Sequence, residues 1–81
     1  MKTYRSIMAN GTILTRKSDK DYTHAWIVLK NNRVYQSGFS VSLYAAERQS
    51  KNWKALLKKV ANDRGETVEV EVMIACTEII K

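Results

Sequence analysis

The 81-residue sequence has no proline, one cysteine, one histidine and three isolated glycines. A single cysteine, Cys76, excludes an internal disulfide and a cysteine-based zinc site. A single histidine, His24, provides neither a paired-histidine metal site nor a catalytic triad with a choice of base. Because Gly11, Gly38 and Gly65 stand apart, there is no glycine-rich loop for ATP or a dinucleotide. We therefore expect a protein that is not an enzyme and has no metal or cofactor.

Long apolar runs are also missing. No run approaches the roughly 18 residues of a transmembrane helix, and the N-terminal residues lead into no apolar core of a signal peptide. Apolar residues nevertheless make up 44% of the chain, which is typical of a globular protein. These features predict a single domain over residues 1–81, located in the cytosol and not bound to a membrane.

The charge is divided along the chain. Residues 1–64 hold thirteen Lys and Arg against four carboxylates, a formal charge of +9, whereas residues 65–81 hold one Lys against four Glu, a charge of −3. A basic body of this kind attracts polyanions, acidic protein surfaces or anionic lipid. The charge pattern thus indicates a class of partner and says little about the fold.

Alternation and turn residues predict five strands and one helix. The expected strands cover residues 3–8, 12–16, 22–29, 33–39 and 67–80. Asn10 and Gly11 form the first turn, residues 16–21 form a polar loop, and residues 30–33 form a second turn. The expected fold class is α+β in the order β-β-β-β-α-β, with one long helix on one face of an antiparallel sheet of about four to five strands.

The helix is predicted from apolar residues at spacings of three and four. These residues are Leu43, Ala46, Ser50, Trp53, Leu57 and Val60. Ser40 or Ser42 can cap the start, and Gly65 can end the helix in a left-handed conformation. The same spacing places Trp53 in the core with Trp26, and Gly38 is expected at a bulge or a close backbone approach. Tyr4 and Tyr35 are expected to be exposed.

Three groups of cations are candidate binding residues. Opposite the apolar stripe, the helix carries Arg48, Lys51, Lys54 and Lys58, together with Lys59, and only Glu47 and Asp63 are acids nearby. The polar loop adds Arg16, Lys17 and Lys20, and the second turn adds Lys30 and Arg33. The alternative interpretation is that these charges simply form a solvated surface.

Two resemblances bear on function. The segment from Arg16 to Ala25, with Asn10 to Thr12 before it and a basic, alanine-containing helix behind, resembles short uncharacterised accessory proteins of bacteriophages over residues 10–61. Such proteins commonly act on host machinery, including restriction and CRISPR systems. The resemblance implies a phage origin and a location in the cytoplasm of the bacterial host cell.

The second resemblance is to DNA-binding domains of the AP2 and integrase-arm type. It is carried by Trp26, the turn from Lys30 to Arg33, Gly38 with Phe39, and Ala45 with Ala46. Those domains read DNA from the exposed face of a sheet, which would here involve Arg5, Arg16, Lys30 and Arg33. The acidic C-terminal strand departs from that pattern.

These observations favour a non-enzymatic, phage-encoded basic module that engages nucleic acid or a host nucleoprotein complex. The alternative is an anti-defence inhibitor, of the anti-CRISPR or anti-restriction type, that binds an acidic host protein directly. A third possibility is an assembly component that associates through its C-terminal strand. Met73, Ala75, Ile79 and Ile80 exceed what one helix can cover, so a homodimer through this strand is also predicted.

Overall fold

The computed structural model describes residues 1–80 and has an α+β fold, as the sequence predicts. The elements in chain order are β1 (Lys2–Ile7), β2 (Ile13–Ser18), β3 (His24–Lys30), β4 (Arg33–Ser40), α1 (Leu43–Asp63), β5 (Val70–Cys76) and β6 (Glu78–Ile80). In this part of the chain no helix is both long enough and apolar enough to cross a membrane.

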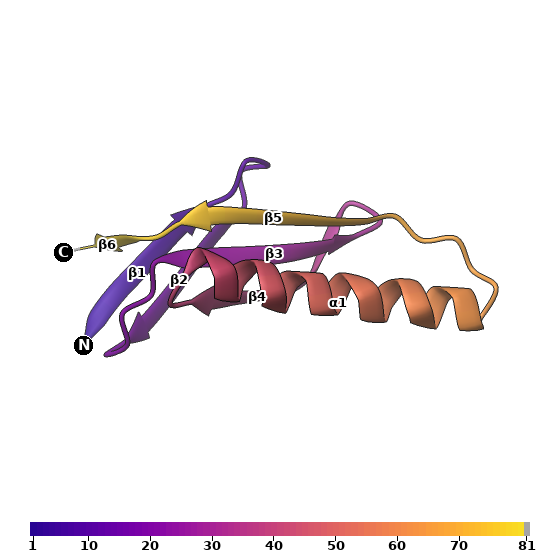
Figure 1. Cartoon of the computed structure of the whole chain (residues 1–81). Helices are drawn as coiled ribbons and strands as arrows, with labels where there is room; N and C mark the ends of the chain where they lie inside the picture. The colour runs from indigo at the N-terminus through magenta and orange to yellow at the C-terminus, as the bar shows by residue number, and fades with distance from the viewer. Residues whose placement is uncertain (81) are drawn as a thin grey trace.

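The strands form two antiparallel three-stranded sheets, in the orders β4-β3-β5 and β2-β1-β6. Helix α1 lies along one face of the β4-β3-β5 sheet, and the β2-β1-β6 sheet lies at the end of the molecule that holds both termini (Figure 1). The C-terminal strand predicted over residues 67–80 is therefore two strands, β5 and β6. Thr77 separates them, because its N–H donates to Thr23 O (3.0 Å) and its hydroxyl donates to Tyr22 O (2.8 Å). Those bonds turn the chain from one sheet to the other.

Both predicted turns are present, and the backbone preferences of their residues explain why the chain turns there. Gly11 has a φ of 88°, and its N–H donates to Met8 O (2.9 Å). Between β3 and β4, Asn31 and Asn32 have φ values of 51° and 67°. Two successive positive φ angles match the right-handed twist of a hairpin, and asparagine tolerates them better than most residues. The local sequence thus decides where both hairpins reverse.

Strand β3 forms the centre of the core, because its residues 25–29 are all buried. Ala25, Ile27 and Leu29 face one side, whereas Trp26 and Val28 face the helix. The first group packs with Met8, Leu14, Phe39, Met73 and Ala75. The second packs with Ala46, Trp53, Leu57, Val70, Val72 and Ile74. A run that is apolar on both faces is what a central strand requires, and the prediction for this segment is confirmed.

Helix α1 begins after Ser42, one of the two predicted caps, whose side chain accepts a hydrogen bond from Ala45 N–H (3.1 Å). The buried residues are Ala46, Ser50, Leu57 and Ala61. The predicted stripe was wrong at its two ends, because Leu43 and Val60 are 48% and 38% exposed. Small side chains at three of the buried positions let the helix approach the sheet closely, and the larger apolar residues are displaced to its flanks.

Trp26 joins the helix to the sheet. Its Nε1–H donates to Gln49 Oε1 (3.0 Å), and the same oxygen accepts a bond from Ser40 Oγ (2.6 Å). A Cβ added at Gly38 would lie 2.6 Å from the Trp26 ring, so the predicted close backbone approach at Gly38 is confirmed. Trp53 packs against the same cluster but is only half-buried.

The predictions of exposure for Tyr4 and Tyr35 had opposite outcomes. Tyr35 is 52% exposed, as predicted. The prediction that Tyr4 is exposed was wrong, because the side chain is 2% exposed and its hydroxyl donates to Lys20 O (2.6 Å). Alternation along β1 directs Tyr4 and Ser6 to the inner face of their sheet. The polar neighbours of Tyr4 occupy the outer face, which is why the local sequence misleads.

Candidate functional site

The side of α1 that faces away from the sheet is basic. Arg48, Lys51, Lys58 and Lys59 are all exposed there. Tyr44, which is 72% exposed, lies one turn before Arg48 on the same side. Lys54 differs from the prediction in being half-buried, because it lies one turn before Lys58, on the flank of the helix that borders β5. The exposed cations are therefore Arg48 and Lys51 in the first half of the helix and Lys58 and Lys59 in the second.

None of these helix cations is in an ion pair with a residue in the range 1–80. The first turn of the helix also has a favourable backbone field for anions. No acidic residue lies in the first turn, and the N-terminal end of a helix has a partial positive charge. A shallow depression of about 260 Å³ lies there, lined by Tyr44, Glu47, Arg48, Lys51 and Asn52. We define this group as the N-terminal helix surface.

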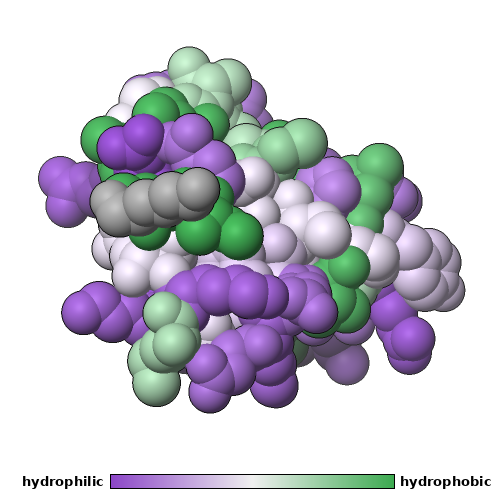
Figure 2. Space-filling view, turned by 90° about the vertical axis from the view of Figure 1, so that its left-hand side faces the viewer, coloured by the Kyte–Doolittle hydropathy of each residue, from purple (hydrophilic) through white to green (hydrophobic). Residues whose placement is uncertain are grey.

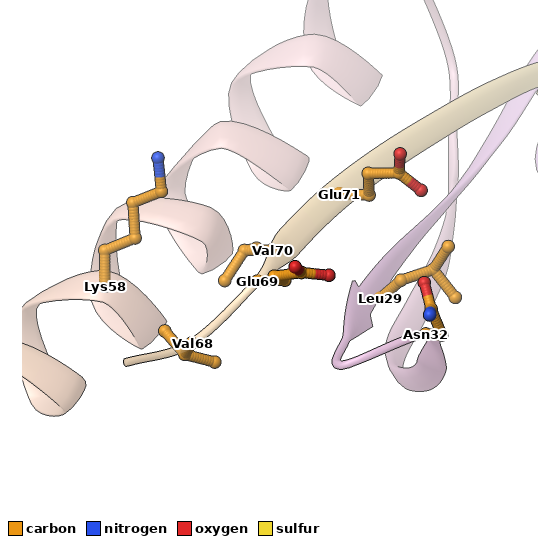
Figure 3. Close-up of a pocket in the computed structure, with 7 residues that line it drawn as sticks. All are labelled: Leu29, Asn32, Lys58, Val68, Glu69, Val70 and Glu71. Carbon is orange, nitrogen blue, oxygen red and sulfur yellow. The ribbon is translucent and has the colours of Figure 1, made fainter. Parts of the chain in front are cut away.

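The second half of the helix has different surroundings, because the acidic C-terminal segment folds back beside it. Lys58 borders a groove of about 370 Å³ that also contains Glu69 and Glu71 (Figure 3). The remaining lining residues are Leu29, Asn32, Val68 and Val70. The backbone of Glu69 is fastened to the β3–β4 turn, since Asn31 N–H donates to Glu69 O (2.9 Å) and Glu69 N–H donates to Asn31 Oδ1 (3.1 Å). The two Glu therefore reduce the positive field around Lys58.

Arg16, Lys17 and Lys20 lie near the other end of the molecule, on and after β2. The guanidinium of Arg16 lies 5.7 Å from the Tyr22 ring centroid and 5.8 Å from that of Phe39, which are cation–π distances. Lys17 and Lys20 are exposed. The prediction of a loop over residues 16–21 was wrong in its first half, because residues 16–18 pair with β1 as part of β2, and of the three cations only Lys20 lies in the loop between β2 and β3.

The two acids of that loop are paired with the N-terminal segment. Asp19 lies 3.5 Å from the N-terminal amine, and Asp21 accepts a hydrogen bond from Lys2. That bond and the charge of Lys2 lower the pKa of Asp21 below 3.8, and the same bond raises the pKa of Lys2 above 10.5. The acids are thus offset by residues that sequence spacing does not connect to them.

Lys30 and Arg33 form a third group at the β3–β4 turn. Lys30 Nζ lies 5.8 Å from the Tyr35 ring centroid, and Arg33 is exposed. The molecule is 47 Å long, and this turn and the Arg16–Lys20 loop lie toward opposite ends of β3 (Figure 1). The nine predicted binding residues therefore form three separate groups and not one surface.

His24 contacts the side chains of two other residues of the fold. Its Nδ1 is 2.7 Å from Thr23 Oγ1, and its Nε2 is 3.9 Å from Cys76 Sγ. No group of three potential metal ligands occurs within residues 1–80.

Tyr44 and Asn52 are the residues of the N-terminal helix surface that the sequence reasoning missed. The signal that could have found them was their place on the same helical side as Arg48.

No protein-family model matches this chain, and neither a curated protein nor a solved structure matches it significantly.

Proposed function

We propose that the chain is a non-enzymatic module that binds nucleic acid through the N-terminal helix surface. The observation that supports this most directly is the exposure of Arg48 and Lys51 without ion pairs, beside the 72% exposed ring of Tyr44. Lys and Arg neutralise phosphates, and an exposed aromatic ring can stack on a base. A rigid helix holds these groups at fixed spacing before the ligand arrives.

Within helix α1, acids oppose the cations of the N-terminal helix surface less than they oppose Lys58. Lys58 lies beside Glu69 and Glu71. Glu47 is the single acid lining the N-terminal helix surface.

The test is a salt series with a labelled 20-base-pair random duplex, a length set by the roughly ten base pairs in one helical turn. Each phosphate neutralised contributes about −0.9 to the slope of log K against log salt, so Arg48 and Lys51 together should contribute about −2. Arg48→Glu with Lys51→Glu should weaken binding at least tenfold and make the slope shallower. Lys17→Glu with Lys20→Glu changes the net charge equally at another site and should have a much smaller effect.

Equal losses in the two double variants would contradict a localised site and indicate attraction to net charge alone. No measurable binding of duplex or oligothymidylate at low salt would contradict nucleic-acid binding altogether. Circular dichroism and thermal melting of each variant provide the control for folding, because exposed charges contribute little to stability.

A second candidate function is direct binding to an acidic host protein. It is favoured by Tyr44, because exposed tyrosine and arginine side chains are typical anchors of protein interfaces. A protein target differs in salt dependence, since apolar contacts of Tyr44 would persist at high salt. Tyr44→Ala should then weaken binding as strongly as Arg48→Glu. The phage origin and the anti-defence role stay predictions.

The homodimer through the C-terminal strand also stays a proposal. β6 pairs with β1 and lies at the edge of its sheet, with Ile79 55% and Ile80 36% exposed. Figure 2 views the molecule from this end and shows several separate apolar patches among polar ones. Ile79→Lys with Ile80→Lys should reduce association measured by sedimentation. A strictly monomeric wild-type protein at high concentration would contradict the dimer.

A further inference from the structure

Helix α1 has apolar side chains that extend beyond the sheet it covers. Trp53, Leu56 and Val60 follow one another at spacings of three and four, so they form one row on the helix. Trp53 packs against the core cluster and lies 6.1 Å from Tyr35, measured between ring centroids. Leu56 and Val60 are 49% and 38% exposed. This row is on the flank of the helix that faces β4, since Trp53 meets Tyr35 there.

The sheet ends at β4 directly beneath this flank. Within residues 1–80, β4 pairs with β3 and has no strand on its other side. Val34 and Tyr35 on this strand are 46% and 52% exposed, and Ser37 is exposed as well. The register between β3 and β4 shifts at Tyr35, and on either side of this irregularity the edge, which has no proline, offers unpaired backbone N–H and C=O groups to another chain.

A groove of about 200 Å³ lies between the helix row and this strand. Its apolar lining comes from Tyr35, Leu56, Leu57, Val60 and Ala61. Neighbouring strands are about 4.8 Å apart, so a strand added outside β4 would lie under Leu56 and Val60. A fourth strand, added to this sheet outside β4, would therefore cover the exposed apolar row.

The charges around the groove determine the chemistry of that strand. Lys30 and Arg64 line the groove with Glu66, and Arg33 is the first residue of the adjoining strand. None of these four side chains is in an ion pair within the described chain. Three cations against one carboxylate favour a ligand that carries acids beside its apolar residues.

We propose that β4 and the groove beside it bind an extended, acidic peptide segment of a partner protein by strand addition. The peptide continues the β4-β3-β5 sheet, and its alternate apolar side chains enter the groove between Tyr35 and Leu56. Its carboxylates lie on the same face of the added strand as these apolar residues, toward the β3–β4 turn, where they face Lys30, Arg33 and Arg64. Four of the five apolar lining residues are aliphatic and Tyr35 is the one aromatic ring among them, so the groove fits aliphatic side chains better than a nucleobase. This proposal is independent of nucleic-acid binding by the N-terminal helix surface.

The probe is a capped, fluorescently labelled peptide of about six residues, the usual length of a strand, in which every second residue is valine or glutamate, so that both types lie on one face, and the residues between are serine. Binding to the full chain is measured by fluorescence anisotropy. A peptide in which every glutamate is replaced by lysine should bind at least tenfold more weakly. Equal affinity for the two peptides would refute the charge assignment.

Leu56→Ser should weaken binding of the acidic peptide at least tenfold by removing one wall of the groove. The matched control is Leu43→Ser, because Leu43 is 48% exposed on the same helix but does not line the groove. It should leave the affinity unchanged. Equal effects of the two variants would overturn the proposed location.

Strand addition itself is tested with wild-type protein, so that no variant has to fold. Two N-methylated peptides are compared, one methylated on odd-numbered and one on even-numbered residues. In an added strand, alternate N–H groups face the neighbouring edge and the others face solvent. One peptide should lose at least tenfold in affinity and the other should retain it, whereas equal behaviour of both would refute strand addition. Loss of oligothymidylate binding in Leu56→Ser, with peptide binding intact, would show instead that the groove accepts a nucleobase.

Discussion

The two sheets have the same number of strands but are stabilised in different ways. In the β4-β3-β5 sheet the central strand is buried on both faces over residues 25–29. In the β2-β1-β6 sheet the central strand buries Tyr4 and Ser6, while Ile7 on the opposite face is 54% exposed. Burial of apolar area is the main stabilising contribution in small domains, so the first sheet is the stable part of the molecule.

Polar contacts, together with the packing of Met8 and Leu14 on the core cluster, hold the second sheet in place. Ser6 Oγ donates to Cys76 O (3.0 Å), Tyr4 donates to Lys20 O, and Arg5 Nε donates to Glu78 Oε1 (2.6 Å). Each such contact contributes only about 1 kcal/mol net. The comparison teaches that strand number alone does not decide stability, and that coverage of both faces does. The predictions below test this difference.

The largest expected loss of stability is in the β4-β3-β5 sheet. Trp26→Ala should lower the free energy of unfolding by about 3–5 kcal/mol, because it empties a buried site and leaves Gln49 without its indole partner. Trp53→Ala should cost about half as much, since Trp53 is half-buried. Urea denaturation of the two variants measures the difference. Equal losses would show that the two tryptophans contribute alike and that helix packing was misjudged.

The close approach at Gly38 should give the next largest effect. Gly38→Ala should destabilise the protein by about 1–3 kcal/mol, because the new methyl group meets the Trp26 ring. In a Trp26→Leu background the same substitution should cost much less. A double-mutant cycle from denaturation data tests the coupling. Additive effects would mean that the cost arises from the backbone and not from the tryptophan ring.

A smaller, local effect is expected in the second sheet. Tyr4→Phe removes the hydrogen bond to Lys20 O and should cost about 1 kcal/mol. Amide hydrogen exchange should accelerate most in β1 and β2, with smaller changes in β3. Uniform acceleration throughout the chain would show instead that the two sheets open as one unit.

The smallest effect is a pH dependence at the N-terminal segment. The pKa of Asp21 is lowered in the folded protein, so its contribution is present above pH 3.8 and is lost as pH falls through the folded-state value. In an NMR titration Asp21 should titrate below 3.8, and Lys2→Met should return its pKa toward that value. Both side chains are exposed, so the global stability should change little. An unchanged Asp21 pKa in Lys2→Met would contradict the pairing.

Much of the fold could be predicted because its signals are local. The apolar run in β3, the Ser42 cap, the left-handed Gly65 and the asparagine turn depend on residues a few positions apart. The close approach at Gly38 was also expected. The division of the C-terminal segment at Thr77 was not, because it depends on carbonyl groups of Tyr22 and Thr23 more than fifty residues away.

The candidate site was only partly predictable. Helical spacing places Arg48, Lys51 and Lys58 on one side of α1, as the sequence predicts. It could not show that Glu69 and Glu71 lie beside Lys58, or that Asp21 is paired with Lys2. The groove between Leu56 and Tyr35 was likewise invisible, since it depends on how far the helix extends past the edge of the sheet.

By itself the sequence determined the α+β class, the positions of the turns and the helix, the central place of β3 and the excess of positive charge. These follow from local backbone preferences and from the periods of apolar residues. Tertiary structure alone decided which strands share a sheet, which cations have few acids near them and which apolar side chains stay exposed. The physical reason is that burial and electrostatic fields depend on distances in space between residues that are far apart in the chain.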